Sequence, residues 1–118
     1  MSPITTTEIA TYEANVVSRG DPNQFAATVW LYKADHSLIA FLRFYRGGIE
    51  MAANQFRTDL NAALVSYRFD AFPTTVDLLR NEKPVYFTWF DYSATVPGRM
   101  FGIVGTSPTE PVGEQEGV

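Results

Sequence analysis

The chain has 118 residues, a net charge of −4 and no cysteine. Its length and its apolar fraction of 46% predict one globular domain with a core of its own, and the lack of cysteine excludes disulfides, thiolate catalysis and cysteine-based zinc sites. All 9 basic residues but only 10 of the 13 acidic residues precede residue 107, so the body is nearly neutral. We therefore expect a globular domain over residues 1–106 and a flexible acidic tail over residues 107–118.

Strand patterns dominate the first half of the chain. Residues 9–18 are rich in β-branched and aromatic side chains and end at a turn cluster over residues 20–23. Residues 25–33 and 38–46 predict two further strands, joined by a tight turn. Gly47-Gly48 then permits a reversal into a short strand over residues 49–52.

The second half contains the clearest helix. Residues 54–64 are compatible with a short helix capped by Asn54 or with an irregular loop, and residues 64–69 alternate as a strand does. Residues 72–82 form an amphipathic helical stripe, with Asp70 as a possible cap, Pro73 in the first turn and a stop at Pro84. Residues 85–92 and 100–104 predict a final pair of strands.

This order of elements indicates the α+β class with mainly antiparallel strands. Short connections between consecutive strands predict a curled meander or half-barrel of about 6–7 strands, with one packed helix over about residues 72–82. A five-stranded Greek-key barrel is a special case of the same order.

The hairpin over residues 25–46 has two apolar faces of different kinds. A turn centred on Asp35-His36 pairs residues whose numbers add to 71. One face then holds an aliphatic and aromatic set that we predict to be core: Phe25, Ala27, Val29, Leu31, Leu38, Ala40, Leu42 and Phe44. The other face pairs Trp30 with Phe41, Thr28 with Arg43, Tyr32 with Ile39 and Ala26 with Tyr45.

The second face is the candidate interaction face, because aromatic residues and arginine are enriched at interfaces. Its candidate residues are Trp30, Tyr32, Phe41, Arg43 and Tyr45. Three interpretations stay open: the helix covers this face, a second copy of the chain covers it, or it binds a ligand or a nucleic acid. Stacked aromatics beside arginine suit single-stranded nucleic acid, whereas the nearly neutral body argues against that partner.

No motif predicts catalysis, a metal or a cofactor. His36 is the only histidine and falls in a turn, and the carboxylates lack metal-ligand spacing. Gly47-Gly48 lacks the lysine and hydroxyl residue of a phosphate loop, and Gly102 falls in a strand, where glycine usually makes room for a neighbouring ring.

The sequence therefore predicts a small non-catalytic interaction module that forms a homodimer or binds a protein partner through the candidate interaction face. The first alternative is single-stranded nucleic-acid binding on that face, and the second is a small-ligand binder or enzyme that uses the concave side of the sheet. The N-terminus lacks a secretory signal pattern, and no apolar run is long enough to span a membrane. We thus expect a soluble cytoplasmic protein.

Overall fold

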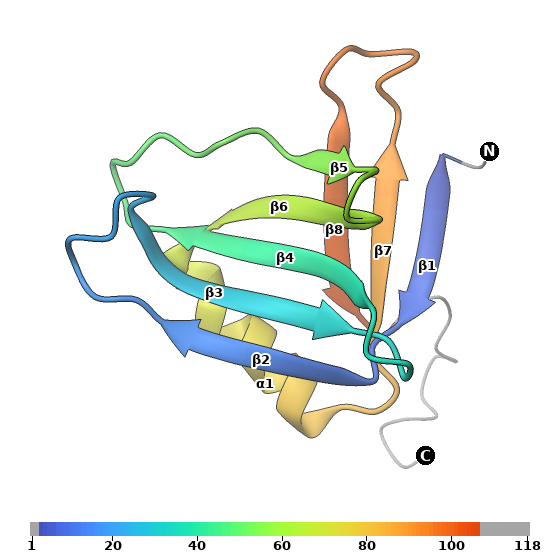
Figure 1. The fold of residues 1–118 in the computed structure, drawn as a ribbon, viewed down its shortest axis with the longest axis horizontal. Coiled ribbons are helices and arrows are strands. Elements are labelled where there is room, and N and C mark those ends of the chain that lie inside the picture. Colours follow the sequence, from blue (N-terminus) through green and yellow to red (C-terminus); the bar gives the residue numbers. More distant parts are fainter. Residues whose placement is uncertain (1–2, 107–118) are drawn as a thin grey trace, which may run out of the picture.

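The computed structural model describes residues 3–106, which form eight strands and one α-helix (Figure 1). In chain order the elements are β1 (Ile4–Glu8), β2 (Thr11–Val16), β3 (Phe25–Tyr32), β4 (Leu38–Tyr45), β5 (Gln55–Arg57), β6 (Ala62–Arg68), a 3₁₀ turn (Phe69–Ala71), α1 (Phe72–Asn81), β7 (Tyr86–Asp91) and β8 (Met100–Gly105). The predicted acidic tail over residues 107–118 lies outside the described residues.

The strands form two sheets that are not closed into a barrel. The larger sheet has the order β2-β3-β4-β6-β5, and the smaller has the order β1-β7-β8. In Figure 1 the three strands of the smaller sheet stand upright beside the five that run across the picture. The predicted α+β class and the dominance of antiparallel pairs are confirmed.

Two pairings depart from a simple meander. β1 pairs with β7 rather than with its neighbour β2, and β4 pairs with β6 in parallel. β5 then occupies the edge beside β6, which places β6 between two strands that precede it in the chain. The chain therefore crosses over between β4 and β6 instead of turning back at once.

The β3–β4 hairpin has the predicted register over its centre. Leu31 pairs with Ala40, Val29 with Leu42 and Trp30 with Phe41. Both ends slip by one residue, because irregularities between Phe25 and Ala27 and between Leu31 and Tyr32 shift the ladder. Tyr45 thus faces Phe25 rather than Ala26, and Tyr32 faces Leu38 rather than Ile39.

The predicted strand over residues 49–52 is wrong, as is the alternative of a helix over residues 54–64. Side chains of β6 instead bind the backbone near both ends of this segment. Arg68 Nη1 donates to the carbonyl of Arg46 at 2.9 Å, and Ser66 Oγ donates to the carbonyl of Ala52 at 2.6 Å. Asn54 caps no helix. Its Oδ1 accepts from Ser66 N at 2.7 Å, and its Nδ2 donates to the Met100 carbonyl of β8 at 3.0 Å.

The predicted helix is confirmed with the predicted start at Phe72, but with a different N-cap residue. Asp70 lies in the 3₁₀ turn, and Ala71 occupies the N-cap position with no side-chain cap. The predicted cap by Asp70 is therefore wrong. Pro73 lies in the first turn, where its missing N–H has no helical partner to lose. Pro84 follows a cis peptide bond with Lys83 and precedes β7.

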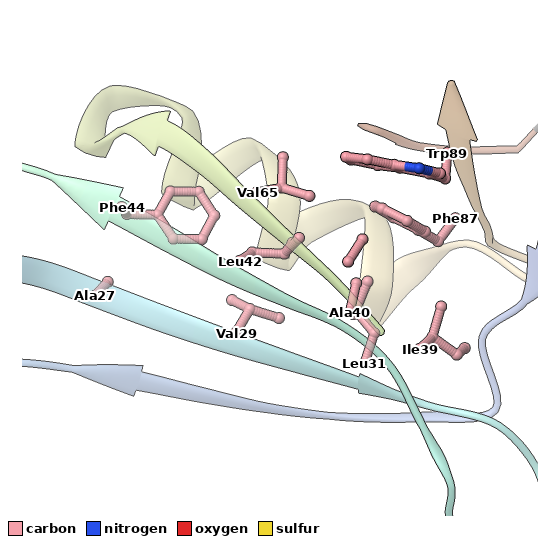
Figure 2. Close-up of a cluster of buried hydrophobic side chains, with 11 residues drawn as sticks. Ala27, Val29, Leu31, Ile39, Ala40, Leu42, Phe44, Val65, Phe87 and Trp89 are labelled. Carbon is pink, nitrogen blue, oxygen red and sulfur yellow. The ribbon is translucent and has the colours of Figure 1, made fainter. Parts of the chain in front are cut away.

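The core lies between the aliphatic face of the larger sheet and two coverings, α1 and the smaller sheet. Phe72 of α1 contacts the ring of Phe44 edge-on at 5.2 Å between centroids, and Leu79 packs on the same cluster. Phe87 and Trp89 approach from β7, as Figure 2 shows. The interpretation that the helix covers the other hairpin face is therefore wrong, because successive strand residues point to opposite faces.

Candidate functional site

The candidate interaction face lies on the side of β3 and β4 opposite the core. Trp30 and Phe41 are cross-strand partners, and their rings stack at 4.1 Å between centroids. Phe25 meets Phe41 edge-on at 6.0 Å and Tyr45 at 5.3 Å. Trp30, Phe41 and Tyr45 are thus linked through Phe25. The prediction that Phe25 lies on the core face is wrong, because the irregularity between Phe25 and Ala27 pairs Phe25 with Tyr45.

Arg43 is not an accessible member of this face. Only 7% of the residue is exposed, and its Nη2 donates to Ser66 Oγ at 2.9 Å and to the Ala53 carbonyl at 3.2 Å. Burial lowers the pKa of the guanidinium, and its Nε has no hydrogen-bond partner among residues 3–106. Arg43 therefore ties the crossover segment to β6.

Tyr45 is also buried, with 4% of its surface exposed. The other three predicted residues, Trp30, Tyr32 and Phe41, are half-buried. The accessible part of the candidate interaction face is therefore a small aromatic patch around the Trp30–Phe41 stack. Its predicted cation, Arg43, is not part of this accessible patch.

A larger concave feature lies between the two sheets. It is a cleft of about 1050 Å³, here named the inter-sheet cleft. Thr5 and Thr7 of β1 form one wall, and their partners in β7, Trp89 and Phe87, form the floor. The opposite wall comes from the larger sheet and the turn between β5 and β6, and consists of Ile39, Phe56, Thr58, Asn61 and Ala63. The rim consists of Pro3, Lys33, Asp91, Tyr92, Ser93, Ala94 and Thr95.

The floor of the cleft is apolar and fixed. Phe87 and Trp89 belong to the buried core, and Trp89 also contacts the ring of Phe56 at 6.3 Å between centroids. Gly102, the partner of Trp89 in β8, leaves the space that the Phe87 ring fills, so the predicted reason for this glycine is confirmed. The floor is therefore preformed by packing within the chain.

The rim adds a few polar groups in set orientations. Asp91 Oδ1 accepts hydrogen bonds from Ser93 Oγ at 2.5 Å and from Ser93 N at 3.0 Å. These bonds lower the pKa of the Asp91 carboxyl group, so it is ionised at neutral pH. Thr5 and Thr7 supply hydroxyls along the wall. The cleft thus combines an apolar floor with polar edges.

Sequence reasoning missed this cleft because it missed β1. The segment Ile4–Glu8 contains three threonines and one strongly apolar residue, so it has a weak strand pattern. Its alternation places Thr5 and Thr7 on the cleft side and Thr6 on the outer side, opposite Thr88. The run of β-branched threonines was the available signal.

The remaining predicted features form no second site. His36 is exposed in the β3–β4 turn with a positive φ of 71°. Within residues 3–106, no group of three or more His, Cys, Asp or Glu side chains is placed to hold a metal ion. The same residues include no helix with the length and apolar character needed to cross a membrane.

Comparison of the chain with models of protein families, with curated proteins and with solved structures finds no match.

Proposed function

We propose that this chain is a small-ligand binding module whose ligand occupies the inter-sheet cleft. The observation that carries the proposal is the cleft itself, with a volume of about 1050 Å³ above the rings of Phe87 and Trp89. Small-molecule sites are typically clefts of about 300–1,000 Å³ with apolar linings and a few placed polar groups. This develops the alternative of a ligand on the concave side of the sheet.

The arrangement supports binding rather than catalysis. General acid–base chemistry needs its groups within hydrogen-bond reach of one reacting atom. The charged residues that line the cleft are Lys33 and Asp91. Asp91 is the last residue of β7, whereas Lys33 follows β3 and lies near the first residue of β7. No described histidine lines the cleft.

Fluorescence tests the proposal directly. The chain has two tryptophans, so Trp30→Phe leaves Trp89 as the sole one. We expect 1-anilinonaphthalene-8-sulfonate to bind this variant and to accept excitation energy from Trp89, because the ring lines the cleft. Absence of energy transfer at saturating probe would contradict the proposal.

Two neighbouring threonines provide a matched pair of variants. Thr5→Phe fills the cleft wall opposite Trp89, whereas Thr6→Phe adds the same ring on the outer face. Both residues are exposed, but Thr6→Phe also removes the 3.3 Å contact between the Thr6 hydroxyl and that of the buried Thr88, so circular dichroism is used to check that both variants are folded. We expect Thr5→Phe to weaken probe binding by about tenfold or more and Thr6→Phe by less than about twofold. Equal affinities would place the probe elsewhere.

A second candidate function is self-association or protein binding through the aromatic patch of the candidate interaction face. The observation in its favour is the half-buried Trp30–Phe41 stack, which lies on the sheet face opposite α1. Stacked aromatic residues of this kind are frequent in interface centres.

Light scattering tests this second candidate. A homodimer would have a molar mass of about twice the 13.2 kDa of the chain, and Phe41→Glu should then yield monomer because it buries a charge at the interface. Val16→Glu is the control, since it adds the same charge at a residue that is 74% exposed on the edge strand β2. A dimer that persists in Phe41→Glu would exclude this patch.

Single-stranded nucleic acid receives less support. Base stacking on Trp30 and Phe41 would need a nearby cation to attract the phosphates. Arg43, the cation of this face, is buried and already donates to Ser66 and Ala53. We therefore propose a small ligand or a protein as the partner, and not a nucleic acid.

A further inference from the structure

The inter-sheet cleft has a direction set by its wall strands. β1 and β7 are antiparallel, with Thr5 beside Trp89 and Thr7 beside Phe87. At one end Asp91 N donates to the Pro3 carbonyl at 2.7 Å. At the other end Ile9 N donates to the Val85 carbonyl at 2.9 Å. The two ends of the wall are therefore distinct.

Opposite charges stand at these two ends. Asp91 closes β7 at the Pro3 end. Lys33 follows Tyr32, whose carbonyl accepts from Ala10 N at 2.8 Å, so Lys33 lies near the Ile9 end. Among the residues that line the cleft, the others carry no formal charge. The cleft thus presents a cation at one end and a carboxylate at the other.

The distance between the ends limits the length of a ligand. From Val85, at the Ile9 end, to Asp91 the chain advances six residues, about 20 Å at ~3.3 Å per residue. The floor between them is the apolar surface of Phe87 and Trp89. A ligand that meets both charged ends must therefore be elongated and apolar in its middle.

The two charged groups are held differently. Ser93 fixes the carboxylate of Asp91 through two hydrogen bonds to Oδ1, and among residues 3–106 no hydrogen bond occupies Oδ2. Lys33 is half-buried, and the carboxylate of Asp35 in the following turn lies within its electrostatic influence. Asp35 is itself bonded to Ser37 N at 2.9 Å and Ser37 Oγ at 2.6 Å, outside the cleft.

We infer that the ligand of the inter-sheet cleft is an elongated bipolar molecule, with an anionic group that meets Lys33, an apolar middle over Phe87 and Trp89, and a cationic group that meets Asp91. This inference rests on the proposed function of the cleft. Two sources supply such chemistry: an aliphatic amino acid with charges at both ends, and a short apolar peptide with free termini.

The test compares ligands of one length and different charge. Calorimetric titration of the full chain with ω-aminododecanoate, dodecanoate and dodecylamine separates the two ends. We expect the bipolar compound to bind about two- to fivefold more tightly than either singly charged one, because the additional charge meets a partly exposed partner. Trileucine is the peptide probe. The tighter of trileucine and ω-aminododecanoate identifies the source, and either one supports the inference.

Four variants assign the ends. Lys33→Gln should remove the advantage of ω-aminododecanoate over dodecylamine, and Asp91→Asn should remove its advantage over dodecanoate. Asn keeps an acceptor for Ser93, so the loop stays in place. Lys83→Gln and Asp35→Asn are the controls: Lys83 lies outside the cleft, and Asp35 repeats the hydrogen bonds of Asp91. Neither control should weaken binding of the bipolar compound.

The outcomes distinguish failure of the bipolar ligand from failure of the cleft as a binding site. Equal affinity of all three alkyl compounds, or variants that leave their ratios unchanged, would overturn the bipolar ligand and leave the cleft proposal standing. If none of these compounds binds and 1-anilinonaphthalene-8-sulfonate receives no energy from Trp89, both the bipolar ligand and the proposed function fail.

Discussion

Gly102 shows how one missing side chain shapes the floor of the inter-sheet cleft. A Cβ at this position would lie 2.6 Å from Cζ of Phe87 and 3.3 Å from Cγ2 of Val65. We expect Gly102→Ala to destabilise the fold by about 1–3 kcal/mol in urea unfolding, because both neighbours are buried. Gly105→Ala is the control in the same strand, since its nearest atom, Cγ2 of Ile103, is 3.9 Å away. Equal losses of stability for the two variants would contradict this packing.

Tyr67 gives the stability of the protein a pH dependence in the alkaline range. Burial raises the pKa of its phenol to about 12, from an ordinary value of 10.0, and the hydroxyl donates to the Gly102 carbonyl at 3.1 Å. Because the folded state holds this proton more tightly, the contribution is intact below pH 10 and is lost as the pH rises towards about 12. The loss is about 2–3 kcal/mol.

Tyr67→Phe isolates this contribution. Urea unfolding of both proteins between pH 8 and pH 12 should show the unaltered chain more stable by about 1 kcal/mol at the lower end, from one hydrogen bond. The difference should shrink above pH 10 and change sign towards pH 12, because the loss of about 2–3 kcal/mol exceeds the initial advantage. A difference that stays constant across this range would mean that Tyr67 titrates equally in both states.

At the scale of elements, the crossover segment joins the two sheets through Asn54. Its side chain accepts from Ser66 N of β6 and donates to the Met100 carbonyl of β8. We expect Asn54→Ala to cost about 2–3 kcal/mol in chemical unfolding, because two partly buried backbone groups lose their partners. Asn15→Ala is the control, as Asn15 lies on the edge strand β2 and its side chain makes, within residues 3–106, only long contacts of 3.3 and 3.5 Å. A cost for Asn54→Ala no greater than for Asn15→Ala would refute the bridging role.

The elements that sequence reasoning found are those whose signals are local. The β3–β4 register could be predicted because the Asp35-His36 turn and the alternation of Val29, Leu31 and Leu42 agree. The ends of that hairpin could not, because the irregularities reflect packing rather than turn chemistry. β1 was missed because it is stabilised by β7, with Thr6 and Thr88 side by side although 82 positions apart.

The candidate site likewise has parts that could be predicted from the sequence and parts that could not. Its aromatic members Trp30 and Phe41 could be placed together from the hairpin register alone. The burial of Arg43 could not, because it depends on Ala53 and Ser66 from a crossover that no local pattern reports. The inter-sheet cleft likewise arises only when β1 and β7 meet the larger sheet.

At the scale of the whole molecule, the two sheets share one core. Phe87 and Trp89 of the smaller sheet are in the same buried cluster as Leu42 and Val65 of the larger (Figure 2). We therefore expect a single cooperative unfolding transition. In Trp30→Phe, fluorescence of Trp89 reports on the smaller sheet, and circular dichroism reports mainly on the larger. Their urea midpoints should coincide, and separated midpoints would mean that the sheets unfold independently.

The parallel contact between β4 and β6 also sets the order in which the chain can assemble. Hairpins close between neighbouring segments within microseconds, but Ala40 can meet Ala63 only after residues 46–61 have looped back. β1 waits longer still, since its partner β7 emerges from the far end of the chain. Such distant pairings delay the rate-limiting step, so refolding is expected on the millisecond-to-second scale of β-rich domains. In newly made chains the β3–β4 hairpin would then form first, and both its aromatic face and its aliphatic face would stay exposed to solvent until the later elements pack.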